Sequence, residues 1–358
     1  MNAYERFEKA IHFIEPDFVP TYDLITHPGI FERYAGREGT VLERNARMCR
    51  TIGLDATRYI HDPDSHWLVG TLEIWTRFFG IDPTAWEARP GGGTWWITRR
   101  PFTDLESLRL HMPRLAGKSA IREWYGTYLK EVHEAFYPHV VFMGETEGPV
   151  TNAFDFCGLQ LFSEAILLAP DLVRQLLDVT TEWARLIVET YTEHPTAPAF
   201  MLADDIAWKG GTLFSPQWLR NEVFPRFRYI MEPLRERGIK CFYHSDGNLN
   251  QVLDELVRDV GIEGLNPVEP SAGMDIVAVR RQYPHLVLLG NIDTSGVLPF
   301  GTPAEVEQAV RNLIHSVAPG GGLLLGSSSE VHAGVPVENA LAMYHAARKY
   351  GRYPIATD

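Results

Sequence analysis

The chain is poor in cysteine: Cys49, Cys157 and Cys241 are the only three among its 358 residues. Their count is odd and their spacings are wide, so the sequence contains neither a CxxC pair nor a disulfide framework. It also lacks a run of about 18 apolar residues, which a membrane-spanning helix would require. The first twenty residues carry acids throughout and have no apolar core, unlike a signal peptide. These absences predict a cytoplasmic protein without disulfides or membrane spans.

Basic residues are scarce relative to acidic ones. Lys and Arg number 33 against 46 Asp and Glu, which gives a formal net charge of -13 and a sequence pI near 5.5. Nucleic-acid partners require a basic surface, so this balance argues against them. Hydrophobic residues make up 45% and charged residues 22%, which is the composition of an ordinary soluble globular protein.

Short apolar or β-branched runs alternate with amphipathic stretches along the chain. The eight apolar runs lie at 18–24, 55–60, 139–144, 198–203, 240–243, 262–266, 285–290 and 321–326. Helical spacing is clear at 4–14, 170–192, 215–237, 248–260, 303–317 and 336–350. This alternation is typical of βα units and a parallel sheet. Eight strands predict an α/β fold of the (β/α)8 TIM barrel type, in which residues 1–358 form a single domain.

One segment near residues 84–100 interrupts the alternation. The stretch 86–98 has the pattern of a β-hairpin with a glycine turn. It falls between the second and third apolar runs, so we interpret it as an insertion that covers part of the barrel mouth. Trp95 and Trp96 are adjacent and cannot both face inward on a strand. We assign Trp95 to the substrate pocket.

Polar residues follow every apolar run, at the strand ends where barrels of this type carry their chemistry. Those that we single out are Asp23, His27, Glu145, Glu147, Asp204, Asp205, His244, Asp246, Asn266, Glu269, Asn291, Asp293 and His332. Few Lys or Arg residues stand among them. Together they predict a pocket lined by acids and His, which fits a metal, a cationic substrate or acid–base catalysis. It does not fit a phosphate site, which needs a Gly-rich turn and basic residues.

Several of these residues also fit structural roles. Asp204 and Asp205 fit a helix-capping pair, and Glu269 followed by proline fits turn chemistry. Asn248 fits a cap for the next helix, which would leave His244 as a buried core residue. The sequence leaves these alternatives open.

Two further strand ends differ in how well a structural role explains them. The segment 291–293 fits an Asx turn. Glu145 and Glu147 lie two residues apart on an extended segment and therefore point the same way. Their charges repel unless a cation or a shared proton relieves them, which indicates a functional role.

The strand-end motifs resemble those of the uroporphyrinogen decarboxylase superfamily. The matching segments are 144–149, 204–205, 244–247, 261–270, 274–275, 290–293, 319–322 and 335–339. The resemblance runs from about residue 1 to 355 and is most specific after residue 200. It implies the (β/α)8 barrel fold. It also implies one of two activities, namely decarboxylation of uroporphyrinogen without a cofactor, or methyl transfer to or from a corrinoid protein or a thiol, usually with zinc.

The chain departs from both activities at defined positions. Decarboxylases of the superfamily carry an arginine-rich motif, RQAGRYLPEY, where residues 21–28 of this chain contain Asp23 and His27 and no arginine. A pocket lined with carboxylates should repel a substrate with many carboxylates. Zinc methyltransferases typically carry His-x-Cys after the fifth strand and a later Cys. Here Asp246 replaces that first Cys, two residues after His244, and the segment 327–330 has no Cys.

The resemblance therefore implies a methyltransferase-like enzyme that moves a methyl group from a small methyl ether or amine to a corrinoid carried by a partner protein. His244 and Asp246 would bind zinc, with Glu147 or Glu269 completing the site. Glu145, Asp204, Asp205 and Asp293 would act in catalysis. Asp23, His27, Trp95, Asn266, Asn291 and His332 would contact the substrate.

Two other functions remain open at this level. One is a metal-free decarboxylase or lyase that acts on another substrate, and the other is a binding protein that has kept the fold and lost catalysis. Members of the superfamily are often dimers, and the sequence does not decide between a monomer and a homodimer.

Overall fold

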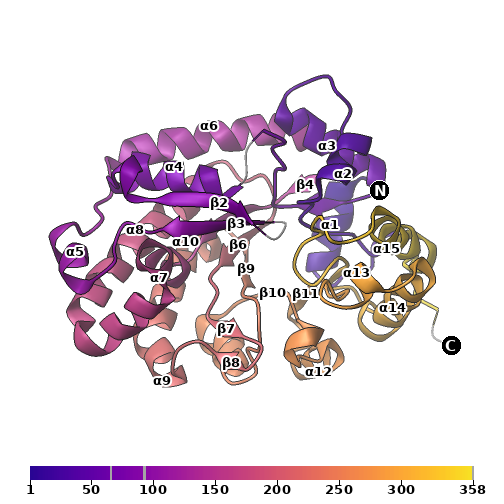
Figure 1. Cartoon of the computed structure of the whole chain (residues 1–358). Helices are drawn as coiled ribbons and strands as arrows, with labels where there is room; N and C mark the ends of the chain where they lie inside the picture. The colour runs from indigo at the N-terminus through magenta and orange to yellow at the C-terminus, as the bar shows by residue number, and fades with distance from the viewer. Residues whose placement is uncertain (65–66, 92–93, 357–358) are drawn as a thin grey trace.

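The computed structural model describes residues 1–64, 67–91 and 94–356 and has an α/β fold (Figure 1). Its largest sheet has six strands, which are β5 (Gly144–Glu147), β6 (Ala199–Ala203), β9 (Lys240–His244), β10 (Gly264–Asn266), β11 (Val287–Leu289) and β12 (Leu323–Leu324). All neighbouring pairs are parallel, and the order across the sheet follows the order along the chain. The carboxyl ends of the six strands therefore meet at one edge.

A second parallel pair joins β1 (Ala56–Thr57) to β4 (Val141–Phe142). Single-residue parallel bridges then connect Tyr22 to Ala56 and Thr21 to Leu325. The predicted run at 18–24 is thus an extended segment that pairs at isolated positions. It lies between the second pair and the last strand of the large sheet.

Helices connect the strands and cover them. They are α1 (Ala3–Ile11), α2 (Pro28–Tyr34), α3 (Val41–Ile52), α4 (Trp67–Phe79), α5 (Leu105–Leu110), α6 (Lys118–Phe136), α7 (Pro149–Leu168), α8 (Pro170–Glu193), α9 (Pro216–Trp218), α10 (Phe224–Glu236), α11 (Leu253–Glu255), α12 (Ile276–Gln282), α13 (Val297–Phe300), α14 (Pro303–Val317) and α15 (Val337–Tyr350). Among the helices that the structure describes, none has the length and hydropathy of a membrane span.

Two predicted helices differ from those observed. The helix expected over 215–237 consists of α9, a π-helical turn at Leu219–Val223 and α10. The helix expected over 248–260 begins only at Leu253. Asn248 does not cap it, because Val252 is the residue before its first turn. Asn248 Oδ1 instead accepts the N–H of Asn250 at 3.0 Å, and its Nδ2 donates to the carbonyl of Ala272 at 2.9 Å.

The insertion near 84–100 is confirmed as a hairpin of β2 (Glu87–Gly91) and β3 (Thr94–Arg99), which pair antiparallel. The chain after it is fixed to α7. Arg100 Nη1 donates to the carbonyl of Asp155 at 2.9 Å, and the backbone of Phe102 donates to that of Phe156 at 3.4 Å. The hairpin is therefore anchored beside the carboxyl ends of the strands.

Alternation along each strand divides the core in two. In β6, Met201 belongs to an inner cluster that also contains Tyr22, Ala56 and Phe242. Its neighbour Phe200 belongs to the outer cluster, where its ring lies 4.8 Å from that of Tyr191 on α8. Residues two apart on a strand share a face, so this division also decides which strand-end residues face the interior.

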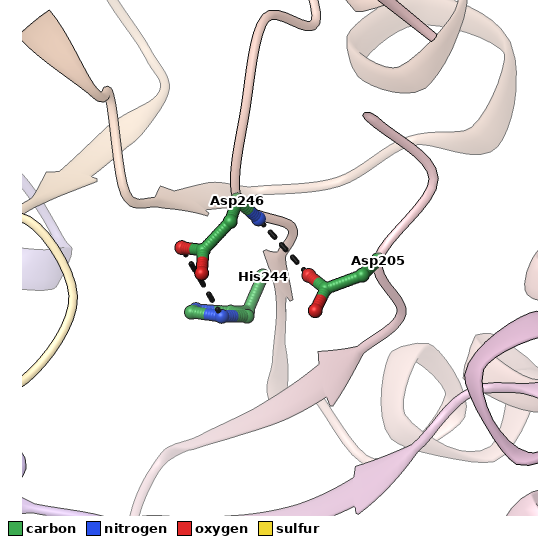
Figure 2. A group of neighbouring side chains, drawn as sticks. All are labelled: Asp205, His244 and Asp246. Atoms are coloured by element: carbon green, nitrogen blue, oxygen red, sulfur yellow. Dashed lines mark hydrogen bonds and ion pairs between the residues drawn. The ribbon is translucent and has the colours of Figure 1, made fainter. Parts of the chain in front are cut away.

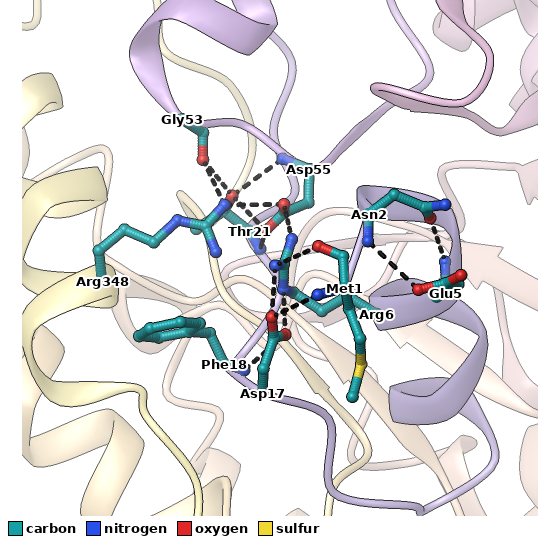
Figure 3. Close-up of polar contacts among 10 residues, drawn as sticks. All are labelled: Met1, Asn2, Glu5, Arg6, Asp17, Phe18, Thr21, Gly53, Asp55 and Arg348. Atoms are coloured by element: carbon teal, nitrogen blue, oxygen red, sulfur yellow. Dashed lines mark hydrogen bonds and ion pairs between the residues drawn. The ribbon is translucent and has the colours of Figure 1, made fainter.

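Buried ion pairs hold the N-terminal segment against the first strands (Figure 3). Asp55 is 3% exposed and accepts hydrogen bonds from Arg6 and Arg348, both at 2.7 Å. It also accepts the backbone N–H of Thr21 at 2.9 Å. Arg6 donates in addition to both carboxylate oxygens of Asp17. The Asp55 carboxylate, directly before β1, thus bonds to α1, to α15 and to the extended segment that contains Thr21.

Replacing Asp55 with alanine should destabilise the fold by about 3–5 kcal/mol, because two guanidinium groups would lose their buried partner. The free energy of unfolding from urea titration measures this loss. The matched control is Asp171→Ala, since the Asp171 side chain is 87% exposed beside Arg174. It should change stability by less than about 1 kcal/mol. Equal effects of the two substitutions would contradict this role of Asp55.

Candidate active site

Three predicted residues converge at the carboxyl ends of β6 and β9 (Figure 2). Asp205 follows β6, His244 ends β9 and Asp246 stands two residues later. One ligand atom from each lies within 4.8 Å of the other two. His244 Nε2 is 3.8 Å from Asp246 Oδ1, and the Asp246 backbone donates to Asp205 Oδ1 at 3.0 Å. We refer to Asp205, His244 and Asp246 as the triad.

Asn266 orients the His244 ring. His244 Nδ1 lies 2.8 Å from Asn266 Oδ1, while Asn266 Nδ2 faces the carbonyl of Leu289 at 3.4 Å. An amide oxygen only accepts, so we place the imidazole proton on Nδ1. Burial, together with nearby Arg58, lowers the pKa of His244 to about 4. The ring is therefore neutral, with the lone pair of Nε2 turned toward the two carboxylates of the triad.

The triad fits a metal ion by the chemistry of its donors. A neutral imidazole and two carboxylates are ligands that zinc accepts. Asp246 Oδ1 is buried and has no hydrogen-bond partner among the described residues, which is costly unless a cation meets it. Burial and nearby Glu269 raise the pKa of Asp246 to about 6. Asp205, His244 and Asp246 therefore offer three potential ligands to one metal ion.

Arg58 is a site residue that sequence reasoning missed. It is 7% exposed, its Nε donates to the Tyr22 hydroxyl at 2.8 Å, and it forms an ion pair with Glu145. Its Nη2 also lies 3.2 Å from His244 Nδ1. Both nitrogens carry protons when Nδ1 donates to Asn266, so this approach is a close contact rather than a hydrogen bond. The alternation of side chains along this strand nevertheless indicates that Arg58 faces the interior. Ala56 belongs to the inner cluster, so a side chain two residues later also faces the interior.

The triad borders a cavity of about 490 Å³. At this end the cavity is also lined by Arg58, Glu145, Glu147 and Glu330. Burial, followed by the charges of Asp155, Asp204 and Asp205, raises the pKa of Glu147 well above its usual range. Its carboxyl therefore holds a proton near neutral pH. Cavities of this size typically hold small molecules.

Two residues predicted to be in the site hold backbone instead. The carboxylate of Asp204 accepts the N–H groups of Val150 at 3.1 Å and Thr151 at 2.6 Å, which caps α7. Glu269 accepts the N–H of Gly247 at 2.9 Å and a hydrogen bond from Ser271. Glu269 is thus engaged in a turn, and Glu147 lies in the cavity wall outside the triad. The third potential ligand beside His244 and Asp246 is Asp205, for which the sequence predicts a catalytic role.

Three others support loops near the strand ends. Asp293 accepts the N–H of Ser295 at 2.8 Å, which is the Asx-turn alternative. His27 caps α2 by accepting the N–H of Ile30 at 3.3 Å. Asn291 donates to the carbonyl of Val268 at 2.9 Å. None of these three side chains is among the described residues that line the cavity.

The remaining predicted residues also lie away from the cavity lining or outside the described atoms. Asp23 is buried and accepts hydrogen bonds from Ser327 and Tyr344, and burial raises its pKa to about 6. His332 accepts the N–H of Gly334 at 3.1 Å. Trp95 lies in β3, and its side chain is outside the part of the chain that the structure describes.

Residues 96–350, well over half of the chain, match the family model described as uroporphyrinogen decarboxylase (URO-D). The chain belongs to the uroporphyrinogen decarboxylase family. Curated relatives of this family member include the methylcobamide:CoM methyltransferase MtaA of Methanosarcina barkeri, 28% identical over 232 residues, which are 62% of each chain. The methylcobamide:CoM methyltransferase MtbA of Methanosarcina mazei is 22% identical over 228 residues, or 63% of this chain and 64% of the relative.

This member of the uroporphyrinogen decarboxylase family thus spans about 62% and 64% of the length of these two curated relatives. A solved structure, a methyltransferase from Methanosarcina mazei, superposes with a TM-score of 0.72 at 21% identity. The match covers 98% of this chain and 99% of that structure. The similarity supports the α/β fold along nearly the whole chain.

The raised pKa of Glu147 predicts a pH dependence of stability. Because its folded pKa lies above the unfolded value, Glu147 contributes stability at low pH that is lost as pH rises through the folded pKa. Glu147→Gln should therefore flatten the decline of unfolding free energy between the unfolded pKa of 4.5 and the folded pKa of about 8. Urea titrations in the presence of a chelator measure the slope. The same substitution at exposed Glu164 should leave the slope unchanged, and a wild-type slope in Glu147→Gln would contradict the assignment.

Proposed function

We propose that the chain is a corrinoid-dependent methyltransferase that moves a methyl group from a small methyl ether or amine to a corrinoid carried by a partner protein. The observation that carries the proposal is the triad, a neutral imidazole between two carboxylates with Asp246 Oδ1 unpartnered. Family membership and the methylcobamide:CoM methyltransferases among its relatives support the reaction class. The corrinoid protein and the small methyl donor are its proposed partners.

In this proposal, Asp205, His244 and Asp246 hold a zinc ion. When bound, zinc supplies Lewis-acid polarisation of the ether oxygen or amine nitrogen. Asn266 serves as a positioning residue, because it fixes the His244 tautomer and ring orientation. The predicted ligand set changes in one position, with Asp205 in place of Glu147 or Glu269.

The proton that the leaving oxygen or nitrogen requires comes, in this proposal, from a residue of the chain. When the bond from the methyl group to oxygen or nitrogen breaks, the methyl group goes to the corrinoid and the remaining atom needs a proton. Glu147 lines the same cavity as the triad and holds a proton at neutral pH because of burial and neighbouring carboxylates. Arg58 holds Glu145 in an ion pair and keeps it against the cavity wall.

The cavity lining disfavours decarboxylation of a substrate with many carboxylates. Arg58 is the one Lys or Arg side chain among the described residues of the lining, and Glu145 already pairs with it. Glu147, Asp205, Asp246 and Glu330 add further acidic groups. Removal of zinc by a chelator distinguishes the two functions. A metal-free lyase would retain its activity, whereas the proposed methyltransferase would lose it.

We also propose that residues 1–358 form one closed (β/α)8 barrel domain. The strand pairings support this proposal. Leu325, directly after β12 of the large sheet, pairs with Thr21, and the next residue, Tyr22, pairs with Ala56 of β1. β1 in turn pairs with β4. β5 begins two residues after β4 ends. This circuit contains the eight runs that the sequence predicts.

Purified protein should bind about one equivalent of zinc, measured by elemental analysis after loading and desalting. His244→Ala and Asp246→Ala should retain less than about a tenth of an equivalent, because each removes a ligand. Asp293→Ala is the matched control, since Asp293 forms an Asx turn outside the cavity lining. Its zinc content should equal that of the wild type. A wild-type protein that takes up no transition metal would overturn the zinc assignment.

Asn266→Ala should weaken zinc binding by about 10–100-fold, because the His244 ring loses the partner that sets its tautomer. Competition with a chelator of known affinity measures the change, and circular dichroism verifies that the variant is folded. An unchanged affinity would show that Asn266 does not position the ligand.

A further inference from the structure

The second half of α7 has apolar residues on every side of the helix. Seven of its ten residues at 159–168 are apolar, and the exceptions are Gln160, Ser163 and Glu164. A surface helix normally turns polar residues to solvent, whereas a helix that is apolar all round is normally covered. α7 lies at the outside of the molecule, beside α8 (Figure 1). One apolar face of it therefore has no cover among the described residues.

Three leucines project from this uncovered face. Leu167 is 81% exposed, Leu168 is 72% exposed and Leu159 is 43% exposed, whereas Phe162 on the inner side of the helix is fully buried. No other helix among the described residues carries more than one exposed leucine. Exposed apolar side chains that gather in this way typically mark an interaction surface.

A groove beside these leucines enlarges the apolar surface. It has a volume of about 250 Å³ and lies between the end of α7, the start of α8 and the π-helical turn at Leu219–Val223. Arg174 and Glu222 stand at its rim, and their ion pair of 3.1 Å leaves no net charge there. The groove thus has room for a projecting apolar side chain of a partner. Its apolar walls are Ile166, Pro170, Val173 and Trp218.

A bend at Gly158 fixes the direction of this half of α7. Gly158 has a φ of 80°, which favours glycine, and it separates the two halves of the helix. A β-carbon at this position would lie 3.1 Å from Nε of Arg100, whose Nη1 is held by the carbonyl of Asp155 at 2.9 Å. The leucines therefore project from a preformed helical segment, and a preformed surface loses less conformational entropy when it binds.

The leucines are arranged symmetrically about Ser163. Leu159 precedes it by four residues and Leu167 follows it by four, so the three side chains form one row along the helix. A two-fold axis at Ser163 would place Leu159 of each copy against Leu167 of the other, and two-fold contacts use the same patch on both copies. Ser163 is small and lets two helices cross closely. Its hydroxyl already donates to the carbonyl of Leu159 at 2.7 Å.

Charge also favours a second copy of the chain as the partner. Residues 157–173 contain no Lys, Arg or His, and their acids are Glu164 and Asp171. A partner recognised by its charge would therefore find little to pair with. Two copies with a net charge of -13 each repel one another in general, and a face with few charges allows them to approach.

The leucines are separate from the candidate active site. A protein that delivers a corrinoid to the triad must reach the cavity, and Leu159, Leu167 and Leu168 are not among its described lining residues. The proposed reaction thus gives these side chains no partner. An occupant other than the corrinoid protein is required to cover them.

We propose that α7 is a self-association surface, through which two copies of the chain pack α7 against α7 about a two-fold axis at Ser163. We refer to Leu159, Ser163, Leu167 and Leu168 as the leucine face. One row of side chains and a groove bury less than the roughly 800 Å² per partner of a standard stable interface. The dimer should therefore be reversible, with a dissociation constant in the micromolar range. This inference does not depend on the proposed reaction.

Sedimentation equilibrium of the full chain measures the association. The average mass should rise from 40.5 kDa, the mass of one chain, toward twice that value between about 1 and 200 μM protein. Added salt should tighten the dimer, because it screens the repulsion between two acidic copies. A mass that stays at 40.5 kDa at about 200 μM, or a dimer that weakens as salt is added, would overturn the proposal.

A charge on the leucine face should separate the copies. Leu167→Glu buries a carboxylate against Leu159 of the second copy and should raise the dissociation constant at least about 100-fold. Phe300→Glu is the matched control, since Phe300 is 85% exposed on α13, at the opposite side of the molecule in Figure 1. It should change the constant by less than about threefold. Circular dichroism verifies that both variants are folded, and equal effects of the two would overturn the proposal.

Ser163→Cys tests the two-fold axis itself. Cys49, Cys157 and Cys241 are buried, so the new thiol is the one exposed thiol of the chain. At a two-fold axis the two new cysteines lie within the reach of a disulfide, and oxidised glutathione should give a covalent dimer. Gln175→Cys, at an exposed position of α8 outside the leucine face, should form one at least about tenfold more slowly. Equal rates would contradict the two-fold arrangement.

Discussion

The hydrogen bond between His244 and Asn266 is the interaction on which the candidate site depends. It holds the imidazole proton on Nδ1 and directs Nε2 toward Asp205 and Asp246. Without it, the ring could rotate within its buried setting, and three potential ligands would not face a common point. The contact joins two strands rather than two loops. A site built on neighbouring strands is held more firmly than one that depends on loop conformation alone.

The register of the sheet explains why these residues meet. Ala203 of β6 pairs with His244 of β9, and His244 pairs with Asn266 of β10. The three neighbouring strands therefore end at the same level, and Asp205 and Asp246 each follow two residues after a paired position. Asp204, one residue earlier, points away from the cavity and caps α7. The alternation of strand residues thus assigns adjacent aspartates to different tasks.

The sequence predicted most of the strands, the hairpin and the proximity of His244 to Asp246, because hydrophobic periodicity and strand-end polarity are local signals. The run at 18–24 pairs only at isolated positions. It did not predict Asp205 as the third member of the triad, since that depends on which side of β6 each aspartate faces. Arg58 was missed because it lies within an apolar run rather than after it. The apolar part of the cavity lining, which includes Trp124 and Trp183, could not be predicted either, because its residues come from helices far apart in the sequence. Asp293 and Glu269 follow strands as expected, yet backbone N–H groups engage their carboxylates.

The central claim is that Asp205, His244 and Asp246 bind zinc through one nitrogen and carboxylate oxygens. X-ray absorption spectroscopy at the zinc edge tests it most directly, because it reports the ligand atoms themselves. The account predicts a shell of nitrogen and oxygen at about 2.0–2.2 Å without sulfur, and loss of the imidazole contribution in His244→Ala. A shell with sulfur at about 2.3 Å, or a spectrum that is unchanged in His244→Ala, would contradict it.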